Sequence, residues 1–154
     1  MVNEIDEKWD DLRPDHIGVR LWEAAQHWKD RYLAEMKKAG HGWQAEARGS
    51  ITAHIHPDGT RQAEIAQRMP ISKQAVHQLI AELESQGIVT RDLDPSDGRG
   101  RIIRFTEAGL AVQRDGARIK GEIHDQMRTQ MGAEAFDRLY ALLGAAVKAP
   151  EENR

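Results

Sequence analysis

The apolar residues that follow Ser72 repeat with the period of an α-helix. Four of them stand at the i, i+3, i+4, i+7 spacing of one buried stripe, namely Val76, Leu79, Ile80 and Leu83. The opposite side carries amides and small residues, which are Gln74, Gln78, Ala81 and Ser85, with His77 on the flank. Ser72 is a favourable N-cap because its hydroxyl can accept a backbone N–H of the first turn. The pattern predicts a helix that is buried on one side and offers hydrogen-bonding groups on the other.

Two further elements are predicted beside this helix. Upstream, residues 61–69 place their apolar side chains on one face, which predicts a second short helix with Thr60 as its cap. Only Pro70 and Ile71 join the two helices, so the corner between them must be sharp. Downstream, Gly87 ends the helix, and two β-branched runs at 88–93 and 101–105 flank a Gly-rich stretch. That arrangement predicts a hairpin with a long, mobile tip at 94–100, and the whole order is typical of a winged helix-turn-helix.

Long amphipathic helices are predicted on both sides of this unit. The first, from Asp15 to Lys38, has a wide stripe made of Ile17, Leu21, Ala24, Trp28, Tyr32 and Met36, with Trp22, Ala25 and Leu33 beside it. Thr106 is predicted to cap a second helix that Gly132 closes, and residues 133–148 form a third. A monomeric winged domain would end near Phe105, so the apolar faces of these helices predict a dimer interface. An enlarged monomeric core is the alternative.

Residues 43–55 are predicted to form another helix, packed beneath the two reading helices. Its small residues, Ala45, Ala47, Gly49 and Ala53, either bring helices close together or leave a cavity. In the second case a pocket for an aromatic anion would combine a concave apolar wall with one fixed cation. Its lining would be Trp22, Trp28, Trp43 and Arg48.

Several motifs resemble those of the multiple-antibiotic-resistance regulator (MarR) family. The most specific is Asp97-Gly98-Arg99 followed at a fixed distance by Phe105-Thr106-Glu107-Ala108-Gly109, and Ile71-Ser72-Lys73-Gln74-Ala75-Val76 is a second. The resemblance is strong over residues 60–109 and extends in layout from Pro14 to Val147. It implies a mainly α fold with a small β-hairpin wing and N- and C-terminal dimerisation helices. It also implies a homodimeric bacterial transcriptional regulator, commonly a repressor, often released by a small aromatic or phenolic ligand.

This resemblance predicts how the chain is divided and which residues touch DNA. We expect an acidic extension at 1–13, a single domain at 14–148 and a tail at 149–154. Within the domain, the winged helix-turn-helix covers about 43–105 and the dimerisation helices cover about 15–38 and 106–148. The expected contacts with a pseudo-palindromic double-stranded operator are Ser72, Lys73, Gln74, His77, Gln78, Asp97, Arg99 and Arg101. Two departures leave the operator sequence open: position 78 is often basic in the family but is Gln here, and Pro70 stands where glycine is common.

The distribution of charge refines this picture more than its total does. The net charge is −3, and residues 1–15 alone hold six acids and two bases. Residues 61–105 hold seven bases and six acids, so the predicted winged segment is nearly neutral. A neutral segment argues against binding that depends only on phosphate neutralisation, but it permits a specific reader with locally placed cations. Ile5, Trp9 and Leu12 allow a short amphipathic helix in the acidic extension, and a frayed tail is the alternative.

The remaining features exclude several other classes of protein. The chain has no cysteine, and hence no disulfide, thiolate metal site or cysteine redox switch. No stretch approaches the roughly 20 apolar residues of a membrane span, and the first residues do not resemble a signal peptide, so we expect a cytoplasmic protein. His54 and His56 would point apart at a helix end, so no metal, cofactor or enzymatic activity is expected. A winged-helix module for protein contacts and, more remotely, a small metal enzyme using these histidines are the alternative functions.

Overall fold

The structure is a computed structural model that describes residues 15–148. The predicted helix at Ile5, Trp9 and Leu12 and the tail at 149–154 lie outside the described residues. The helices are α2 (Ile17–Lys38), the 3₁₀ helix η1 (Gly42–Ala45), α3 (Ala47–Thr52), α4 (Gln62–Arg68), α5 (Lys73–Ser85), α6 (Glu107–Met131) and α7 (Ala133–Lys148). The strands are β1 (Thr60–Arg61), β2 (Val89–Asp94) and β3 (Asp97–Phe105). The fold is therefore mainly helical with one small sheet, as the sequence predicts.

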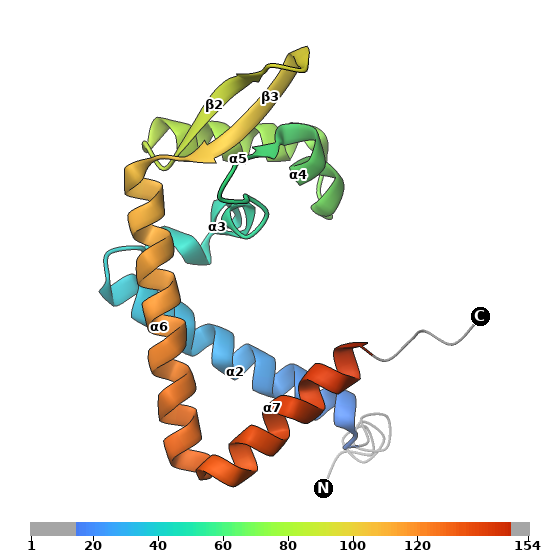
Figure 1. Ribbon diagram of the computed structural model, residues 1–154, viewed down its shortest axis with the longest axis vertical. Helices are drawn as coiled ribbons and strands as arrows, with labels where there is room; N and C mark the ends of the chain where they lie inside the picture. Colours follow the sequence, from blue (N-terminus) through green and yellow to red (C-terminus); the bar gives the residue numbers. More distant parts are fainter. Residues whose placement is uncertain (1–14, 149–154) are drawn as a thin grey trace, which may run out of the picture.

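The molecule has a winged lobe and an arm of long helices. Figure 1 shows α3, α4, α5 and the sheet gathered at one end, with α6 running away from the base of the wing. The helix α2 packs against α6, and α7 turns back from the far end of α6. The long helix α6 thus joins the two parts, and the side chain of Thr106 accepts the Gly109 N–H as the predicted cap.

The wing is a three-stranded antiparallel sheet in the order β1-β3-β2. Two predictions about it are wrong. Thr60 does not cap α4 but lies buried in β1, opposite Ile103, and Arg61 occupies the N-cap position. The long tip is also absent, because the strands extend to Asp94 and Asp97 and leave only a two-residue turn between them. The register is irregular at this end, because Leu93 lies opposite Arg101 whereas Asp94 lies opposite Asp97.

The helix predicted at 43–55 is shorter and interrupted. Residues 42–45 form the 3₁₀ helix, and α3 begins at Ala47 after Glu46 adopts an extended backbone. Gly49 is buried where a Cβ atom would lie 2.2 Å from the Gln44 carbonyl oxygen. A continuous α-helix would not bring these two backbones together, so this close approach explains the break. At Gly49, close packing is therefore the reason for a small residue.

A single core connects the winged lobe with the adjoining ends of α2 and α6. Met36, Ile51, Ile65, Ile80 and Leu83 have no exposed surface. The other core members include Val76, Ile103, Val112, Ile119 and Ile123. The predicted stripe of α5 is thus buried as expected, with Leu79 packed against it. Among the described residues, no helix combines the length and apolar character that crossing a membrane requires.

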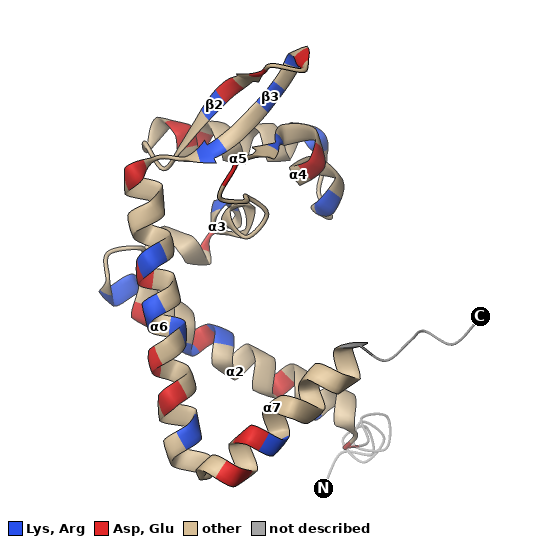
Figure 2. Ribbon diagram, in the orientation of Figure 1, with Lys and Arg blue, Asp and Glu red and all other residues tan. Residues whose placement is uncertain are grey.

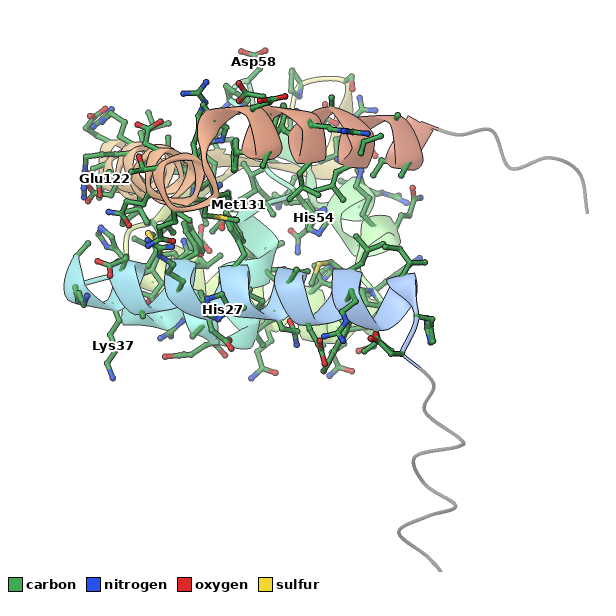
Figure 3. The ribbon with its side chains drawn as sticks, turned by 90° about the horizontal axis from the view of Figure 1, so that it is seen from below. His27, Lys37, His54, Asp58, Glu122 and Met131 are labelled. Carbon is green, nitrogen blue, oxygen red and sulfur yellow. The ribbon has the colours of Figure 1, made fainter. Side chains whose placement is uncertain are left out.

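The far ends of α2 and α7 leave large apolar side chains uncovered. On α2, Ile17 is 75% exposed and Trp22 is 64% exposed, although Met36 at the other end is fully buried. The exposed apolar residues of α7 are Leu139, Tyr140, Leu142, Leu143 and Val147. Figure 3 shows α2 and α7 as separate rods seen from below, with Met131 projecting from the α6–α7 corner toward the α2 side and Lys37 projecting outward. These two helices therefore carry most of the large apolar side chains that the described residues leave exposed.

Candidate nucleic-acid interface

The helix α5 presents the face that its sequence pattern predicts. The Ser72 hydroxyl accepts the Ala75 N–H at 3.1 Å and caps the helix. Val76, Ile80 and Leu83 anchor the buried side. The predicted DNA contacts on this helix and its cap are all exposed, namely Ser72, Lys73, Gln74, His77 and Gln78. A helix rigidly held on one side with free amides on the other has the geometry that base-edge recognition requires.

The lysine and arginine side chains of α4, α5 and the wing fall into two groups. Arg61, Arg91 and Arg104 form ion pairs with Asp94, Glu84 and Asp92 at 2.7 to 3.0 Å, and Arg68 faces Glu64 at 3.8 Å. Within the described residues, Lys73, Arg99 and Arg101 have no such carboxylate partner. These three are the cations that the sequence analysis assigned to DNA. Figure 2 shows both charge signs distributed over the wing, so the available positive charge is local rather than a general feature of this lobe.

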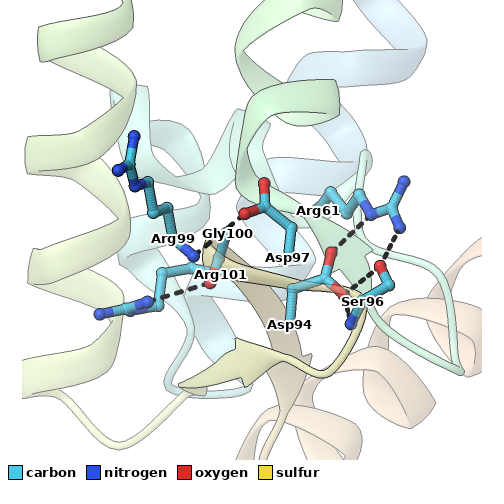
Figure 4. Close-up of polar contacts among 7 residues, drawn as sticks. All are labelled: Arg61, Asp94, Ser96, Asp97, Arg99, Gly100 and Arg101. Carbon is cyan, nitrogen blue, oxygen red and sulfur yellow. Dashed lines mark hydrogen bonds and ion pairs between the residues drawn. The ribbon is translucent and has the colours of Figure 1, made fainter.

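Arg99 lies near the start of β3, at the tip of the wing. The Arg99 N–H donates to the Asp97 carboxylate at 3.1 Å, so Asp97 braces the backbone of Arg99 rather than its guanidinium. Both side chains are exposed. Arg101 is half-buried and donates from its guanidinium to the Gly100 carbonyl oxygen at 3.0 Å. Figure 4 shows Arg99, Gly100 and Arg101 on one side of the tip, and Arg61, Asp94 and Ser96 on the other.

A second group at the base of the tip was missed by sequence reasoning. Asp94 is buried and accepts hydrogen bonds from Ser96 and Arg61. The hydrogen bonds from the Ser96 side chain and backbone, followed by those from Arg61, lower the pKa of the Asp94 carboxyl from 3.8 to about 2. This carboxylate therefore stays ionised over the whole physiological range. The Asp-Pro-Ser sequence signals a turn, but nothing local to it points to Arg61, which lies 33 residues away.

A pocket of about 410 Å³ lies where α2, η1, α3 and α6 meet. Trp28 and Tyr32 stack with their ring centroids 5.5 Å apart, and the Lys120 ammonium lies 5.4 Å from the centre of the Tyr32 ring. Burial raises the pKa of the Tyr32 hydroxyl, which keeps it a hydrogen-bond donor. The small residues Ala45, Gly49 and Ala53 form part of its wall.

Only one of the four predicted pocket residues lines this pocket. Trp28 is in the wall, whereas Trp22 lies exposed on α2 and Trp43 packs against the core. Arg48 pairs with Glu46 at 2.8 Å and does not line the pocket. The cations in the wall are instead Lys29 and Lys120, which helical periodicity alone does not bring together.

The histidines at 54 and 56 do not form part of a metal-binding group. Among residues 15–148, no cluster of three or more histidine or acidic side chains is placed to hold a metal ion. The His56 backbone N–H donates to the Thr60 hydroxyl at 2.9 Å, which ties the turn before β1. The segment therefore has a structural role at the entrance to the wing.

Comparison with known sequences identifies the same segment. A model of the MarR family matches residues 54–100, which include α4, α5 and most of the hairpin. An uncharacterized HTH-type transcriptional regulator of Bacillus subtilis (strain 168), YdgJ, is 27% identical over 84 residues. That match covers 54% of this chain and 51% of YdgJ, so it spans about half the length of this curated relative.

Comparison with solved structures extends the likeness to nearly the whole chain. Wild-type MarR from E. coli in its apo form covers 90% of this chain with a TM-score of 0.68 and 21% identity, and all of that chain is covered. A mutant of MepR from S. aureus covers 88% with a TM-score of 0.71 and 17% identity, and 98% of that chain is covered. At these identities the likeness shows a shared fold. The described helices and the wing thus share the architecture of these proteins from end to end.

Proposed function

We propose that the chain is a winged helix-turn-helix protein of the MarR family, whose model matches residues 54–100, and that it is a sequence-specific DNA-binding transcriptional regulator. The observation that carries the proposal is the surface formed by α5 and the wing tip. It combines two exposed amides, Gln74 and Gln78, with cations that lack carboxylate partners within the described residues. Family members regulate transcription rather than catalyse reactions, and the proposed role places this chain in the bacterial cytoplasm, with DNA.

In this role the two parts of the surface do different work. The amides of Gln74 and Gln78 each bond N6 and N7 of an adenine in the major groove, and His77 donates to or accepts from a neighbouring base edge. The first turn of α5 offers backbone N–H groups and the Ser72 hydroxyl to a phosphate, next to Lys73. Arg99 enters the minor groove, where a narrow A·T-rich stretch attracts an arginine most strongly. Arg101 supports the wing beside a phosphate.

The proposal includes a homodimer built on the uncovered faces of α2 and α7. Large apolar side chains exposed on these two helices favour an interface with another protein, and a second copy of the chain related by two-fold symmetry can supply that partner. A dimer would set two α5 helices in successive major grooves, roughly 34–36 Å apart, on a pseudo-palindromic operator. Binding of such a site beside a promoter gives repression by occlusion.

A small aromatic anion is the effector that the pocket between α2 and α6 would accept. Trp28 and Tyr32 supply aromatic walls, while Lys29 and Lys120 supply positive charge. The pocket joins α2 and α6 of the arm to α3 of the winged lobe, so its occupant would alter the position of one relative to the other. Benzoate, with cyclohexanecarboxylate as the non-aromatic control, is the simplest probe. We expect benzoate, but not cyclohexanecarboxylate, to weaken operator binding, and we expect Lys120→Gln to reduce the effect of benzoate.

The test of the function is binding of the full chain to the DNA upstream of its own gene. Fluorescence anisotropy on overlapping duplexes from that region should find one site bound about 10³-fold or more tightly than a scrambled duplex of the same composition, at one fixed salt concentration. Equal affinity for all duplexes would contradict sequence-specific regulation. In that outcome the wing and α5 would be reassigned to contacts with a protein.

A further inference from the structure

Asp94 is the one buried charged side chain of the described residues. Its side chain is 3% exposed, and the other buried polar residues are neutral. A carboxylate removed from water in this way requires partners for its oxygens, or it destabilises the fold. Its location is also unusual for a buried charge, because Asp94 ends β2 beside the turn of the wing and is not surrounded by the buried apolar cluster alone.

Both carboxylate oxygens of Asp94 have partners, and these come from two separate segments. Oδ2 accepts from Arg61 Nε at 2.7 Å, and Oδ1 accepts from the Ser96 backbone N–H at 2.9 Å and from its hydroxyl at 2.7 Å. The other end of the Arg61 guanidinium donates to the Ser96 hydroxyl at 2.8 Å. The three side chains therefore close a triangle, drawn in Figure 4. We refer to Arg61, Asp94 and Ser96 as the wing strut.

The strut lies where the sheet stops supporting the tip. The strand β1 pairs with β3 only at Thr60 with Ile103 and at Arg61 with Ile102. Beyond Ile102 the wing is a two-stranded ribbon, and such a ribbon is marginally stable alone. The β2–β3 register is also irregular between Leu93 and Asp94. Arg61 is the last residue of the supporting strand, and its side chain reaches forward to the unsupported turn.

Gly100 makes room for this arrangement on the opposite strand. A Cβ atom at Gly100 would lie 3.0 Å from the Asp94 Cβ atom and 3.2 Å from the Asp97 carbonyl oxygen. A side chain there would push the two strands apart at the position of the carboxylate. Gly100 directly follows Arg99, so the strut is adjacent to the residue assigned to the minor groove.

We infer that Asp94 is a positioning residue for DNA reading, which, through Arg61 and Ser96, fixes the wing tip and Arg99 relative to the helix-turn-helix. The inference rests on the proposed function. Arg61 immediately precedes α4, and α4 packs against α5, so the strut joins the minor-groove arginine to the major-groove helix through side chains. Arg61 is also half-exposed on a DNA-facing lobe, and the obvious alternative is that it binds a phosphate. Its pairing with Asp94 leaves its charge neutralised.

A double-mutant cycle distinguishes positioning from a general effect on folding. Asp94→Asn, Arg99→Ala and the double variant are compared by fluorescence anisotropy on the operator, after circular dichroism confirms that each is folded. We expect Arg99→Ala to weaken binding by about tenfold in the parent and by less than about threefold in Asp94→Asn. A merely structural role of Asp94 would leave the effect of Arg99→Ala unchanged in both backgrounds. Equal effects would overturn the inference.

Arg61→Lys separates the strut from a phosphate contact. Lysine keeps the positive charge, but it cannot bond Asp94 and Ser96 at once in the geometry of a guanidinium. The strut predicts that Arg61→Lys weakens operator binding as Asp94→Asn does, because both variants release the wing tip that carries Arg99. Parental affinity in Arg61→Lys would show a phosphate contact and overturn the inference.

Three outcomes of these experiments have a fixed interpretation. If Asp94→Asn fails to fold, Ser96→Ala replaces it in the cycle, because that variant removes only the hydroxyl and leaves the Arg61–Asp94 pair. If the parent protein does not prefer any operator over scrambled DNA, the proposed function falls and the inference falls with it. A parent that prefers its operator while the cycle shows no coupling contradicts the inference alone.

Discussion

The winged lobe and the helical arm differ in how completely each buries its own apolar surface. In the lobe, Ile51, Ile65, Ile80 and Leu83 are fully buried, and the exposed side of α5 is polar. In the arm, the same kind of amphipathic pattern leaves Leu142 59% exposed and Val147 87% exposed. The apolar side of α5 is therefore buried within one chain, whereas the apolar side of α7 remains exposed and requires a partner. Recognition and assembly are built into separate parts of the molecule, with α6 joining them.

The largest effect should come from placing a charge on the uncovered face of α7. Leu143→Asp would bury an unpaired carboxylate in the proposed interface, so we expect a monomer by sedimentation at micromolar concentration. Loss of the second half-site should then weaken operator binding by about 10² or more. Leu93→Asp is the matched control for the sedimentation measurement, because it makes the same substitution at a residue that is 64% exposed on the wing, outside the arm. This control should remain a dimer. A parent protein that sediments as a 17 kDa monomer would contradict the dimer directly.

Two glycines of α6 allow a comparison of the end of α6 that packs against the winged lobe with the part of α6 that is open to solvent. A Cβ atom at Gly109 would lie 2.1 Å from the Ile88 carbonyl oxygen, whereas nothing lies within 4 Å of one at Gly121. We expect Gly109→Ala to lower the free energy of unfolding by about 1–3 kcal/mol. Gly121→Ala should raise it by up to about 1 kcal/mol, because alanine favours a helix interior. Urea unfolding measures the free energy of unfolding of both variants. Equal changes in the two variants would contradict the difference in packing between the two positions.

Acid should affect the wing through Asp94. The pKa of this carboxyl is lowered to about 2, so the folded state favours its charged form more than the unfolded chain does. Its contribution to stability is complete well above the ordinary value of 3.8 and is lost as the pH falls through about 2. The stability difference between the parent and Asp94→Asn should therefore shrink over that range. Thermal unfolding at a series of pH values tests this, with Asp97→Asn as a control for removing a wing charge. A difference that is independent of pH would contradict the strut as a source of stability.

The sequence predicts those parts of the fold that depend on a local pattern, such as the helical repeat of apolar residues or a capping residue. The stripe of Val76, Ile80 and Leu83 and the caps at Ser72 and Thr106 needed no knowledge of distant residues. The two-residue strand β1 is too short to carry a period, so Thr60 was assigned to a helix cap instead. The turn at Pro95 and Ser96 looked like a long loop because its composition is that of loops, while the ladder that orders it depends on the partner strand.

The site shows the same division between local and distant information. Exposure of Gln74 and Gln78 follows from helical periodicity, and it was predicted. Three features depend on contacts between segments far apart in sequence, so no local pattern announces them: the strut between Arg61 and Asp94, the approach of Gln44 to Gly49, and the meeting of Lys120 with Tyr32. The pocket predicted from the sequence consequently shares only Trp28 with the wall of the cavity between α2 and α6.

The most direct test of the account compares how two residues of the recognition surface respond to salt. Arg99→Ala should weaken binding to the operator and to scrambled DNA alike and lower the slope of log affinity against log salt by about 1. Gln78→Ala should cost roughly 1–3 kcal/mol on the operator alone and leave the slope unchanged. Fluorescence anisotropy on both duplexes at several salt concentrations gives all of these quantities. If both variants bind as the parent does while remaining folded and dimeric, this surface does not read DNA.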